Sequence, residues 1–265
     1  MKSETKSTVK TQGEPSPPTY SAPAIDKALD VLELLAESAQ GMSLTGIAEA
    51  LGRTKQELFR VLVCLVERGY LVRDEMQIYR LSTKMFEIGS QHASTQTLIA
   101  RAMPHMERLS AQLGESCHLN LVVQNRMLVI ARVEAAADVM LTVRVGATFE
   151  LHRRNSGLVG LAYLPAHRRE DYWKQAGESA EEIRDYEEHL AQIRLQGVRE
   201  AESPIVHGVR DTAAPILSSG TSLLGVLCVS HVKRMDEPLD RSDILNAVCQ
   251  TARNISGEFG PIEYN

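Results

Sequence analysis

The sequence predicts a mixed α/β protein, more narrowly an α+β protein with two domains. The chain has 265 residues, which is enough for one large or two modest domains. Apolar residues recur at helical spacing between residues 24 and 68, which favours a small helical domain near the N-terminus. Short apolar segments separated by turn residues follow from residue 115 onward and favour a second domain that contains strands.

The first twenty residues have a different composition. They are rich in Ser, Thr, Pro and Lys and hold few apolar side chains, so we expect residues 1–20 to form a disordered tail. A solvated tail is the simpler interpretation of this segment. The alternative is that Lys2, Lys6 and Lys10 contact a phosphate backbone.

Two helices are predicted next, within a domain that we place at residues 21–82. Apolar side chains recur at helical spacing over residues 24–38, which favours an amphipathic helix. Ser43 is a suitable N-cap for a second helix, and Gly52 is a suitable residue to end it.

A third helix and a hairpin complete this domain. Residues Thr54 to Glu57 have the T-x-x-E form of a capping box, which begins a helix that runs to about Arg68. Two short apolar-bearing segments, residues 70–73 and 78–81, flank a polar turn and predict a β-hairpin. Three helices followed by a hairpin, with a tight turn before the third helix, predict a winged helix-turn-helix that binds DNA.

The outward face of the third helix carries the candidate base contacts. Its apolar residues face inward, whereas Gln56 and Arg60, four residues apart, point to the opposite side. Glutamine matches adenine and arginine matches guanine in the major groove. Glu57 is either a member of the capping box or an acceptor for cytosine. The candidate DNA contacts are Arg53, Thr54, Lys55, Gln56, Glu57, Arg60, Arg73 and Arg80. For the arginines of the turn and the hairpin, an exposed surface arginine without a DNA contact is the simpler interpretation.

The remaining chain is predicted to hold a linker and the second domain. Residues 83–98 are expected to form a helix that links the two domains, and residues 99–260 an α+β domain. In this domain the pattern predicts strands at 118–123, 127–133, 139–145, 206–217 and 223–230, and helices at 99–113, 155–164, around 183–193 and at 240–258.

The distribution of charge indicates an oligomer. The formal net charge is −5, and residues 21–92 hold 8 Lys and Arg against 10 Asp and Glu. Because phosphate neutralisation provides much of the affinity for DNA, a single copy of this domain is expected to bind DNA weakly. We therefore expect a homodimer or a dimer of dimers that binds a repeated or palindromic operator in double-stranded DNA.

Nothing in the sequence indicates a secreted, membrane-bound or metal-dependent protein. The four cysteines contain no C-x-x-C pair, no apolar run approaches ~18 residues, and residues 1–20 lack the apolar core of a signal peptide. We expect a cytoplasmic protein with free thiols, without membrane association, bound metal or cofactor. No nucleophile elbow, phosphate-binding loop, dinucleotide fingerprint or metalloprotease helix is present, so we do not expect an enzyme.

Over about residues 22–260 the chain resembles the IclR-type bacterial transcriptional regulators. The N-terminal part of the resemblance rests on AIDKALDVLELLAE, SLTGIAEALGRTKQELFRVLVCLVERGYLVRD and IYRL. The C-terminal part rests on VGATFELHRRNSGLVGLAYL, IRLQGVREAESPIVHGVRDTAAPI and LLGVLCVSH. The resemblance implies a GAF-like effector-binding and oligomerisation domain at residues 99–260. It also implies dimers or tetramers whose affinity for DNA changes with a small organic metabolite, commonly a carboxylic or aromatic acid.

The chain departs from the family pattern in both domains. The third helix begins Thr-Lys-Gln-Glu where the family has a proline followed by Lys-Ser-Thr, so the operator of relatives is not expected here. Asp211 stands where the family often has a cysteine, and two arginines follow the Leu-His pair where small residues are usual. By resemblance, the effector pocket is expected to include Arg153, Arg154, Asn155, Ser156, Gly157, Asp211, Ser230 and His231.

Asp211 leaves two interpretations of this pocket open. A buried carboxylate needs a partner, and Arg153 or Arg154 is the one we expect. Either an arginine also binds a carboxylate of a polar effector through bidentate hydrogen bonds, or an internal ion pair fills the pocket. Two other functions stay open: a constitutive DNA-binding regulator with a structural second domain, and an enzyme with an accessory DNA-binding-like domain.

Overall fold

The computed structural model describes residues 22–91, 93–138, 140–218, 221–232 and 240–260. The chain divides into two compact units, residues 1–92 and 93–265, and each unit is described by itself. The predicted disordered tail at residues 1–20 lies outside the described residues. None of the helices in the described ranges has the length and apolar character that crossing a bilayer requires.

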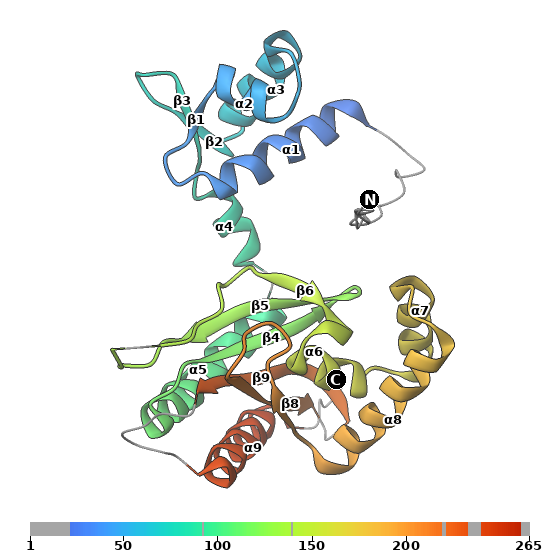
Figure 1. Ribbon diagram of the computed structural model, residues 1–265. Helices are drawn as coiled ribbons and strands as arrows, with labels where there is room; N and C mark the ends of the chain where they lie inside the picture. The colour runs from blue at the N-terminus through green and yellow to red at the C-terminus, as the bar shows by residue number, and fades with distance from the viewer. Residues whose placement is uncertain (1–21, 92, 139, 219–220, 233–239, 261–265) are drawn as a thin grey trace, which may run out of the picture. The chain divides into compact units, whose positions relative to one another are not determined.

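The N-terminal unit has the predicted order of three helices and a hairpin (Figure 1). Its elements are α1 (Pro23–Glu37), β1 (Met42–Ser43), α2 (Leu44–Ala50), α3 (Lys55–Glu67), β2 (Leu71–Arg73), β3 (Ile78–Leu81) and α4 (Lys84–Gly89). The winged helix-turn-helix is therefore confirmed. The short strand β1 is not predicted by the sequence; it pairs antiparallel with β3, so that the sheet has the order β1-β3-β2.

The apolar stripe of α3 forms the centre of this unit. Leu58 and Leu62 are fully buried, and they share a core with Val31 of α1 and Tyr79 of β3. Gly52, with φ +60°, makes the tight turn between α2 and α3, a conformation that favours glycine. The turn and the core together fix the direction in which the opposite face of α3 points.

The predicted linker helix differs from the structure. The sequence pattern predicts one helix over residues 83–98, whereas the described residues form α4 and the first turns of a separate helix, α5 (Ala93–Leu113). Helix α4 ends at Gly89. The next residue, Ser90, is its C-cap, and the Ser90 backbone N–H donates to the Phe86 carbonyl at 2.8 Å. An amphipathic pattern that continues across a helix end cannot reveal that end, because periodicity reports on the faces of a helix and not on its caps.

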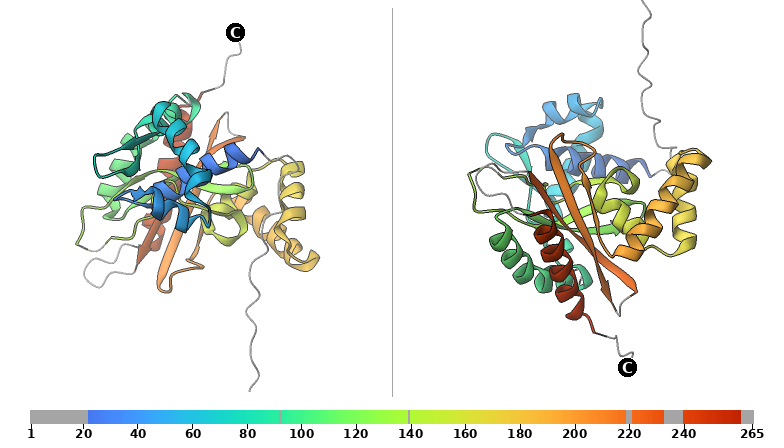
Figure 2. Two further views of the ribbon diagram at one scale, coloured as in Figure 1. Left: turned by 90° about the horizontal axis from the view of Figure 1, so that it is seen from above. Right: turned by 60° about the horizontal axis from the view of Figure 1, so that its bottom comes forward.

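The C-terminal unit is built on a six-stranded antiparallel sheet with the order β6-β5-β4-β9-β8-β7 (Figures 1 and 2). Its strands are β4 (Cys117–Val123), β5 (Arg126–Val133), β6 (Thr148–Glu150), β7 (Arg199–Glu202), β8 (Val209–Ser218) and β9 (Ser222–Val232). Its helices, besides α5, are the 3-10 helix η1 (Leu151–Arg153), α6 (Asn155–Ala162), α7 (Ala166–Ala176), α8 (Ala180–Gln196) and α9 (Arg241–Gly257). The sequence pattern does not predict β7 and α7.

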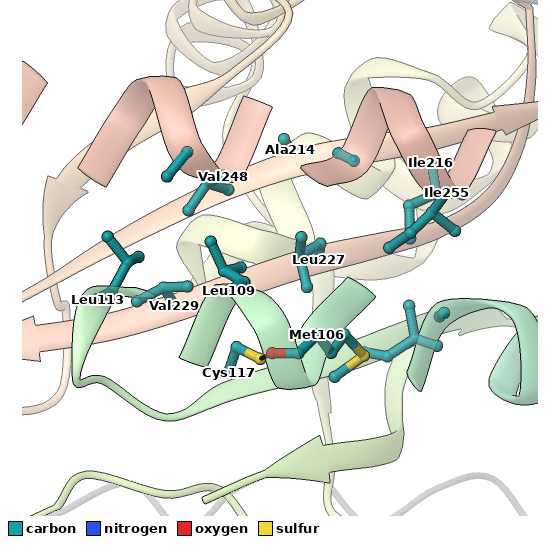
Figure 3. Packing of buried hydrophobic residues seen from close by; sticks show 14 of the residues in the cluster. Met106, Leu109, Leu113, Cys117, Ala214, Ile216, Leu227, Val229, Val248 and Ile255 are labelled. Atoms are coloured by element: carbon teal, nitrogen blue, oxygen red, sulfur yellow. Dashed lines mark hydrogen bonds between the residues drawn. The ribbon is translucent and has the colours of Figure 1, made fainter. Parts of the chain in front are cut away.

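Helices cover both faces of this sheet. On one face α5 and α9 pack side by side, and the buried residues that they contribute include Met106, Leu109, Val248 and Ile255 (Figure 3). Leu227 of β9 belongs to the same core (Figure 3). On the other face α6, α7 and α8 form a second core. Each large side chain that is fully buried in these cores contributes roughly 1.5–3 kcal/mol to folding.

The predicted strand over residues 139–145 is wrong for the residues that the structure describes. Residues 140–145 form no strand, and residue 139 lies outside the described residues. The strand that pairs with β5 is β6, which begins only at Thr148, after a turn in which Gly146 has φ +86°. The apolar side chains of Leu141 and Val143, which suggest a strand, line a cavity instead.

Candidate functional site

A reciprocal cap fixes the start of α3. The backbone N–H of Glu57 donates to Thr54 Oγ1 at 3.3 Å, and the backbone N–H of Thr54 donates to Glu57 Oε2 at 3.0 Å. Lys27 of α1 donates to the other oxygen, Oε1, at 3.0 Å. The hydrogen bond from the Thr54 backbone and the Lys27 ammonium lower the pKa of the Glu57 carboxyl to about 2. The capping-box interpretation is confirmed, and a cytosine contact of Glu57 stays a prediction.

Replacing Thr54 with alanine is expected to destabilise α3. The substitution removes the side-chain acceptor of the cap and should cost about 1 kcal/mol, whereas Thr54→Ser keeps an oxygen in place and should cost little. Amide hydrogen exchange in α3 measures the difference between the two variants. Equal protection of α3 in both variants would show that the cap does not stabilise this helix.

The outward face of α3 is exposed and polar. Lys55, Gln56 and Arg60 are all exposed, and within the described residues their side chains have no hydrogen-bond or ion-pair partner. Phe59 lies on the same helix and is 49 % exposed. An exposed phenylalanine is suited to an apolar contact with a thymine methyl group. Phe59 is therefore a further candidate DNA contact, and its position among polar residues of the helix is the sequence signal for it.

Two of the candidate arginines are held by carboxylates inside the N-terminal unit. Arg53 Nη2 lies 2.8 Å from Asp30 Oδ2, which ties the turn before α3 to α1. Arg80 Nη1 lies 2.5 Å from Asp74 Oδ2, which closes the turn of the hairpin. These ion pairs support a structural role for both arginines and leave their predicted phosphate contacts without support.

Arg73 is in a different position from the other two arginines. It is exposed on β2, and its guanidinium lies over the ring of Tyr79 at 5.4 Å from the ring centre. Within the described residues it has no carboxylate partner. Its guanidinium is therefore available to contact a phosphate on the hairpin side of the unit.

In the C-terminal unit, five of the predicted pocket residues line one cavity of about 270 Å³, which we call the sheet cavity. These five residues are Arg154, Asn155, Ser156, Asp211 and Ser230. The other residues that line it are His118, Leu141, Thr142, Val143, Ala147, Thr148, Phe149, Ser203, Ile205, Val206, Val209 and Cys228. A wall that is largely apolar with a few convergent polar groups is typical of a small-molecule site.

The partner of Asp211 is not an arginine, which corrects the sequence-based prediction. Ser230 Oγ donates to Asp211 Oδ1 at 2.7 Å, and Asn155 Nδ2 donates to Asp211 Oδ2 at 3.1 Å. Arg153 instead pairs with a glutamate of β6, and Arg154 lies over an aromatic ring. Among the described residues, no arginine lies within ion-pair distance of the Asp211 carboxylate. The internal ion pair that would fill the pocket is therefore not formed by the described residues. Two neutral donors bind the buried carboxylate instead.

Three of the predicted pocket residues lie outside the sheet cavity. Gly157 faces the preceding 3-10 helix, where a Cβ atom would lie 2.1 Å from the Leu151 carbonyl oxygen. His231 is buried beside Thr212, with Nε2 lying 3.4 Å from the threonine Oγ1. Arg153 is exposed and lies in an ion pair with Glu150. Gly157 therefore permits close packing, and the other two residues do not reach the cavity.

His118 and Cys228 are pocket residues that the sequence reasoning does not identify. They sit opposite each other in the β4–β9 ladder, and Asp211 sits opposite Ser230 in the β8–β9 ladder. The signal is the strand period of two, since Cys228 and Ser230 share one face of β9. Burial lowers the pKa of His118 to about 4 and raises the pKa of the Cys228 thiol. Both groups are therefore neutral at pH 7.

His118 is expected to make the C-terminal unit sensitive to acid. Because its pKa is about 4 in the folded chain, against 6.5 for a histidine exposed to water, the unfolded chain binds the proton more readily. Stability is therefore fully present above pH 6.5 and falls as the pH is lowered toward 4, by roughly 3 kcal/mol from this residue. Urea unfolding followed by Trp173 fluorescence measures this loss. His118→Gln should flatten the pH dependence, and an unchanged slope in that variant would contradict the assignment.

Both parts of the chain match models of one protein family. Residues 24–75 match the IclR helix-turn-helix domain, and residues 90–257 match the C-terminal domain of the bacterial transcriptional regulator IclR. The second match alone covers more than half of the chain. The chain belongs to the IclR family. As a member of the IclR family, it is a transcriptional regulator with a helix-turn-helix domain and an effector-binding domain, not an enzyme.

Curated IclR-family relatives match nearly the whole chain. The HTH-type transcriptional regulator BhcR of Paracoccus denitrificans is 30 % identical over 249 residues, which cover 90 % of this chain and 88 % of BhcR. The glycerol operon regulatory protein of Streptomyces coelicolor is 27 % identical over 246 residues, which cover 89 % and 96 % of the two chains. These relatives bear the names of transcriptional regulators.

Solved IclR-type structures share the fold of this chain. The Pseudomonas aeruginosa HmgR structure matches with a TM-score of 0.72 and 24 % identity, over 90 % of this chain and 100 % of that chain. An IclR homologue from Microbacterium hydrocarbonoxydans, solved in complex with 4-hydroxybenzoate, matches with a TM-score of 0.74 and 21 % identity. That match covers 89 % of this chain and 98 % of the other.

Proposed function

We propose that this IclR-family regulator acts in the cytoplasm and binds a specific operator in double-stranded DNA through the outward face of α3. The observation that carries the proposal is the exposure of Gln56 and Arg60, which lack partners among the described residues. Both side chains can form two hydrogen bonds to a base edge in the major groove. Lys55 and Arg73 are proposed to contact phosphates, which orient the unit on the duplex.

We also propose that the sheet cavity binds the effector, a small organic acid. Helix α6 begins at Asn155 without a side-chain cap, so its first N–H groups suit a carboxylate. Arg154 adds a guanidinium to the same wall. Phe149 and Val206 give an apolar wall for the body of the ligand, and Asp211 accepts a hydrogen bond from a hydroxyl group. Asp211 stands where the family often has cysteine and is therefore proposed to select among effectors.

The effector is tested by thermal shift on the full chain, with 4-hydroxybenzoate as the first probe because an IclR homologue binds it. A ligand that binds the folded state raises the Tm, by more when its concentration is higher relative to its Kd. We expect acids to raise the Tm and 4-hydroxybenzyl alcohol, which lacks the carboxylate, to raise it less. Arg154→Gln should remove that difference. If no acid in an aliphatic and aromatic panel shifts the Tm or the operator affinity, the C-terminal domain is structural and the regulator is constitutive.

We further propose that the regulator works as a homodimer or a dimer of dimers. Exposed apolar side chains in the N-terminal unit support this, because such side chains are often covered by a second copy. They include Ile25 and Leu29 of α1, and Phe86 of α4, which is 76 % exposed. The slight excess of acidic residues in the DNA-binding unit gives a second reason, since two copies double the number of phosphate contacts. Analytical ultracentrifugation tests this proposal, and a species with the mass of one chain at micromolar concentration would contradict it.

A further inference from the structure

A second cavity, of about 560 Å³, lies outside the proposed effector site. We call it the side cavity. Its lining comes from the η1–α6 connection, from α8, and from β7 with the loop that follows it. The residues that the argument uses are His152, Arg154, Glu178, Tyr186, Arg199 and Glu202. It shares Arg154, Asn155 and Ile205 with the sheet cavity, so the two cavities adjoin.

Arg199 is the central cation of the side cavity. Its Nε donates to Asn155 Oδ1 at 2.8 Å, and among the described residues no carboxylate lies within ion-pair distance of its guanidinium. Burial, which removes part of its hydration, lowers the pKa of this guanidinium. A desolvated guanidinium with free N–H groups is suited to an anion.

The carboxylates that line the side cavity do not neutralise Arg199. Glu178 Oε1 lies 3.0 Å from His152 Nε2 and is not within ion-pair distance of an arginine in the described part of the chain. Glu202 is 80 % exposed at its side chain, and its nearest cation is Arg210 at 3.8 Å. Arg154 also has no carboxylate partner in the described part of the chain. Arg153, a third arginine of the lining, is paired with Glu150. The cavity therefore holds two unneutralised guanidinium groups.

We propose that the side cavity binds a small oxyanion, a carboxylate or phosphate group, with Arg199 as its main contact and Arg154 as the second. The Tyr186 hydroxyl, on the same wall, adds a further donor. Binding in the side cavity would also be linked to the sheet cavity through the hydrogen bonds of Asn155. Arg199 holds Asn155, and the Asn155 amide in turn donates to Asp211 at 3.1 Å and to the Glu202 carbonyl at 2.9 Å.

The experiment is a calorimetric titration of the full chain with inorganic phosphate or acetate at constant temperature, with chloride used to hold ionic strength constant. We expect a heat of binding that saturates as the site fills, whereas the general stabilising effect of phosphate on proteins has no such end point. The ion that binds more tightly, phosphate or acetate, identifies the class of group that the site takes. A wild-type chain with no saturable heat of binding for either ion would overturn the proposal.

Three variants test whether the ion binds in the side cavity. Arg199→Gln should weaken the apparent binding at least about tenfold, because it removes charge-assisted hydrogen bonds. Arg184→Gln removes the same charge from an exposed position of α8 that does not line the cavity, and it should leave binding unchanged. Ser230→Ala alters only the sheet cavity and should also leave binding unchanged. Full binding in Arg199→Gln, or loss of binding in Ser230→Ala, would overturn the proposal.

Arg154→Gln provides a second measurement if Arg199→Gln does not fold. Arg154 makes a single long hydrogen bond, 3.3 Å to the Arg153 carbonyl, so its removal disturbs the fold little. The variant should weaken phosphate or acetate binding several-fold. Unchanged binding in Arg154→Gln would overturn the two-arginine site. Because Arg154 also lines the sheet cavity, weaker binding in Arg154→Gln supports the side cavity only when Ser230→Ala leaves binding unchanged.

Discussion

Replacing Gln56 and Arg60 together with alanine is expected to weaken specific operator binding strongly while the fold is retained. Each bidentate contact to a base contributes roughly 1–3 kcal/mol of discrimination, so the double variant should bind its operator roughly 30-fold more weakly or worse. Both residues are exposed and make no hydrogen bond or ion pair with another described side chain, so their removal should leave the core of α3 intact. Gel retardation on DNA from the region upstream of the regulator's own gene measures the loss.

A matched control separates base reading from general charge. Arg68 is an exposed arginine at the other end of α3, and Arg68→Ala removes one positive charge without touching the proposed reading face. It should change operator affinity by only the small amount expected for one distant charge. Equal losses in Arg68→Ala and in the double variant would show that α3 acts through net charge and not through base contacts.

Gly157→Ala is expected to have the largest effect on stability. A Cβ atom at this position would lie 2.1 Å from the Leu151 carbonyl oxygen and 2.8 Å from its carbonyl carbon, so either η1 or α6 must move. Because the obstacle is backbone and not a flexible side chain, the cost should reach or exceed the upper end of the roughly 1–3 kcal/mol typical of overpacking. Urea unfolding followed by fluorescence of Trp173, which is buried in the same core, measures it.

Gly257→Ala is the matched control for Gly157→Ala. Gly257 is an exposed helical glycine at the end of α9, and a Cβ atom there would meet nothing within 4 Å. The variant should change the free energy of unfolding by about 0.5 kcal/mol or less. If Gly157→Ala is as harmless as Gly257→Ala, then the close approach of α6 to η1 is not required for the fold of the C-terminal unit.

Local signals predict much of the N-terminal unit correctly. The T-x-x-E pattern at Thr54 predicts a capping box, and the structure forms it, because both partners lie within one turn of helix. The outward position of Gln56 follows from the spacing of the apolar residues that α3 buries. The end of α4 is not predicted, because the amphipathic pattern continues past Gly89, where that helix ends.

The sheet cavity is harder to predict, because its walls come from distant parts of the chain. Asp211 is bonded by Asn155, which lies 56 positions earlier in the sequence, so its partner depends on how α6 packs against β8. His118 is a cavity residue only because β4 pairs with β9, and nothing near His118 in the sequence reveals that pairing. Leu141 suggests a strand because apolar side chains that line a cavity look like those that pack on a sheet.

The central claim is that occupation of the sheet cavity changes the affinity of α3 for DNA. The most direct test is the operator Kd of the full chain with and without an acid that raises its Tm, measured at one salt concentration. Allosteric coupling of typical size predicts a change in Kd of at least about fivefold. Arg154→Gln should reduce that change. An acid that raises the Tm of the wild-type chain and leaves the operator Kd unchanged would contradict the claim.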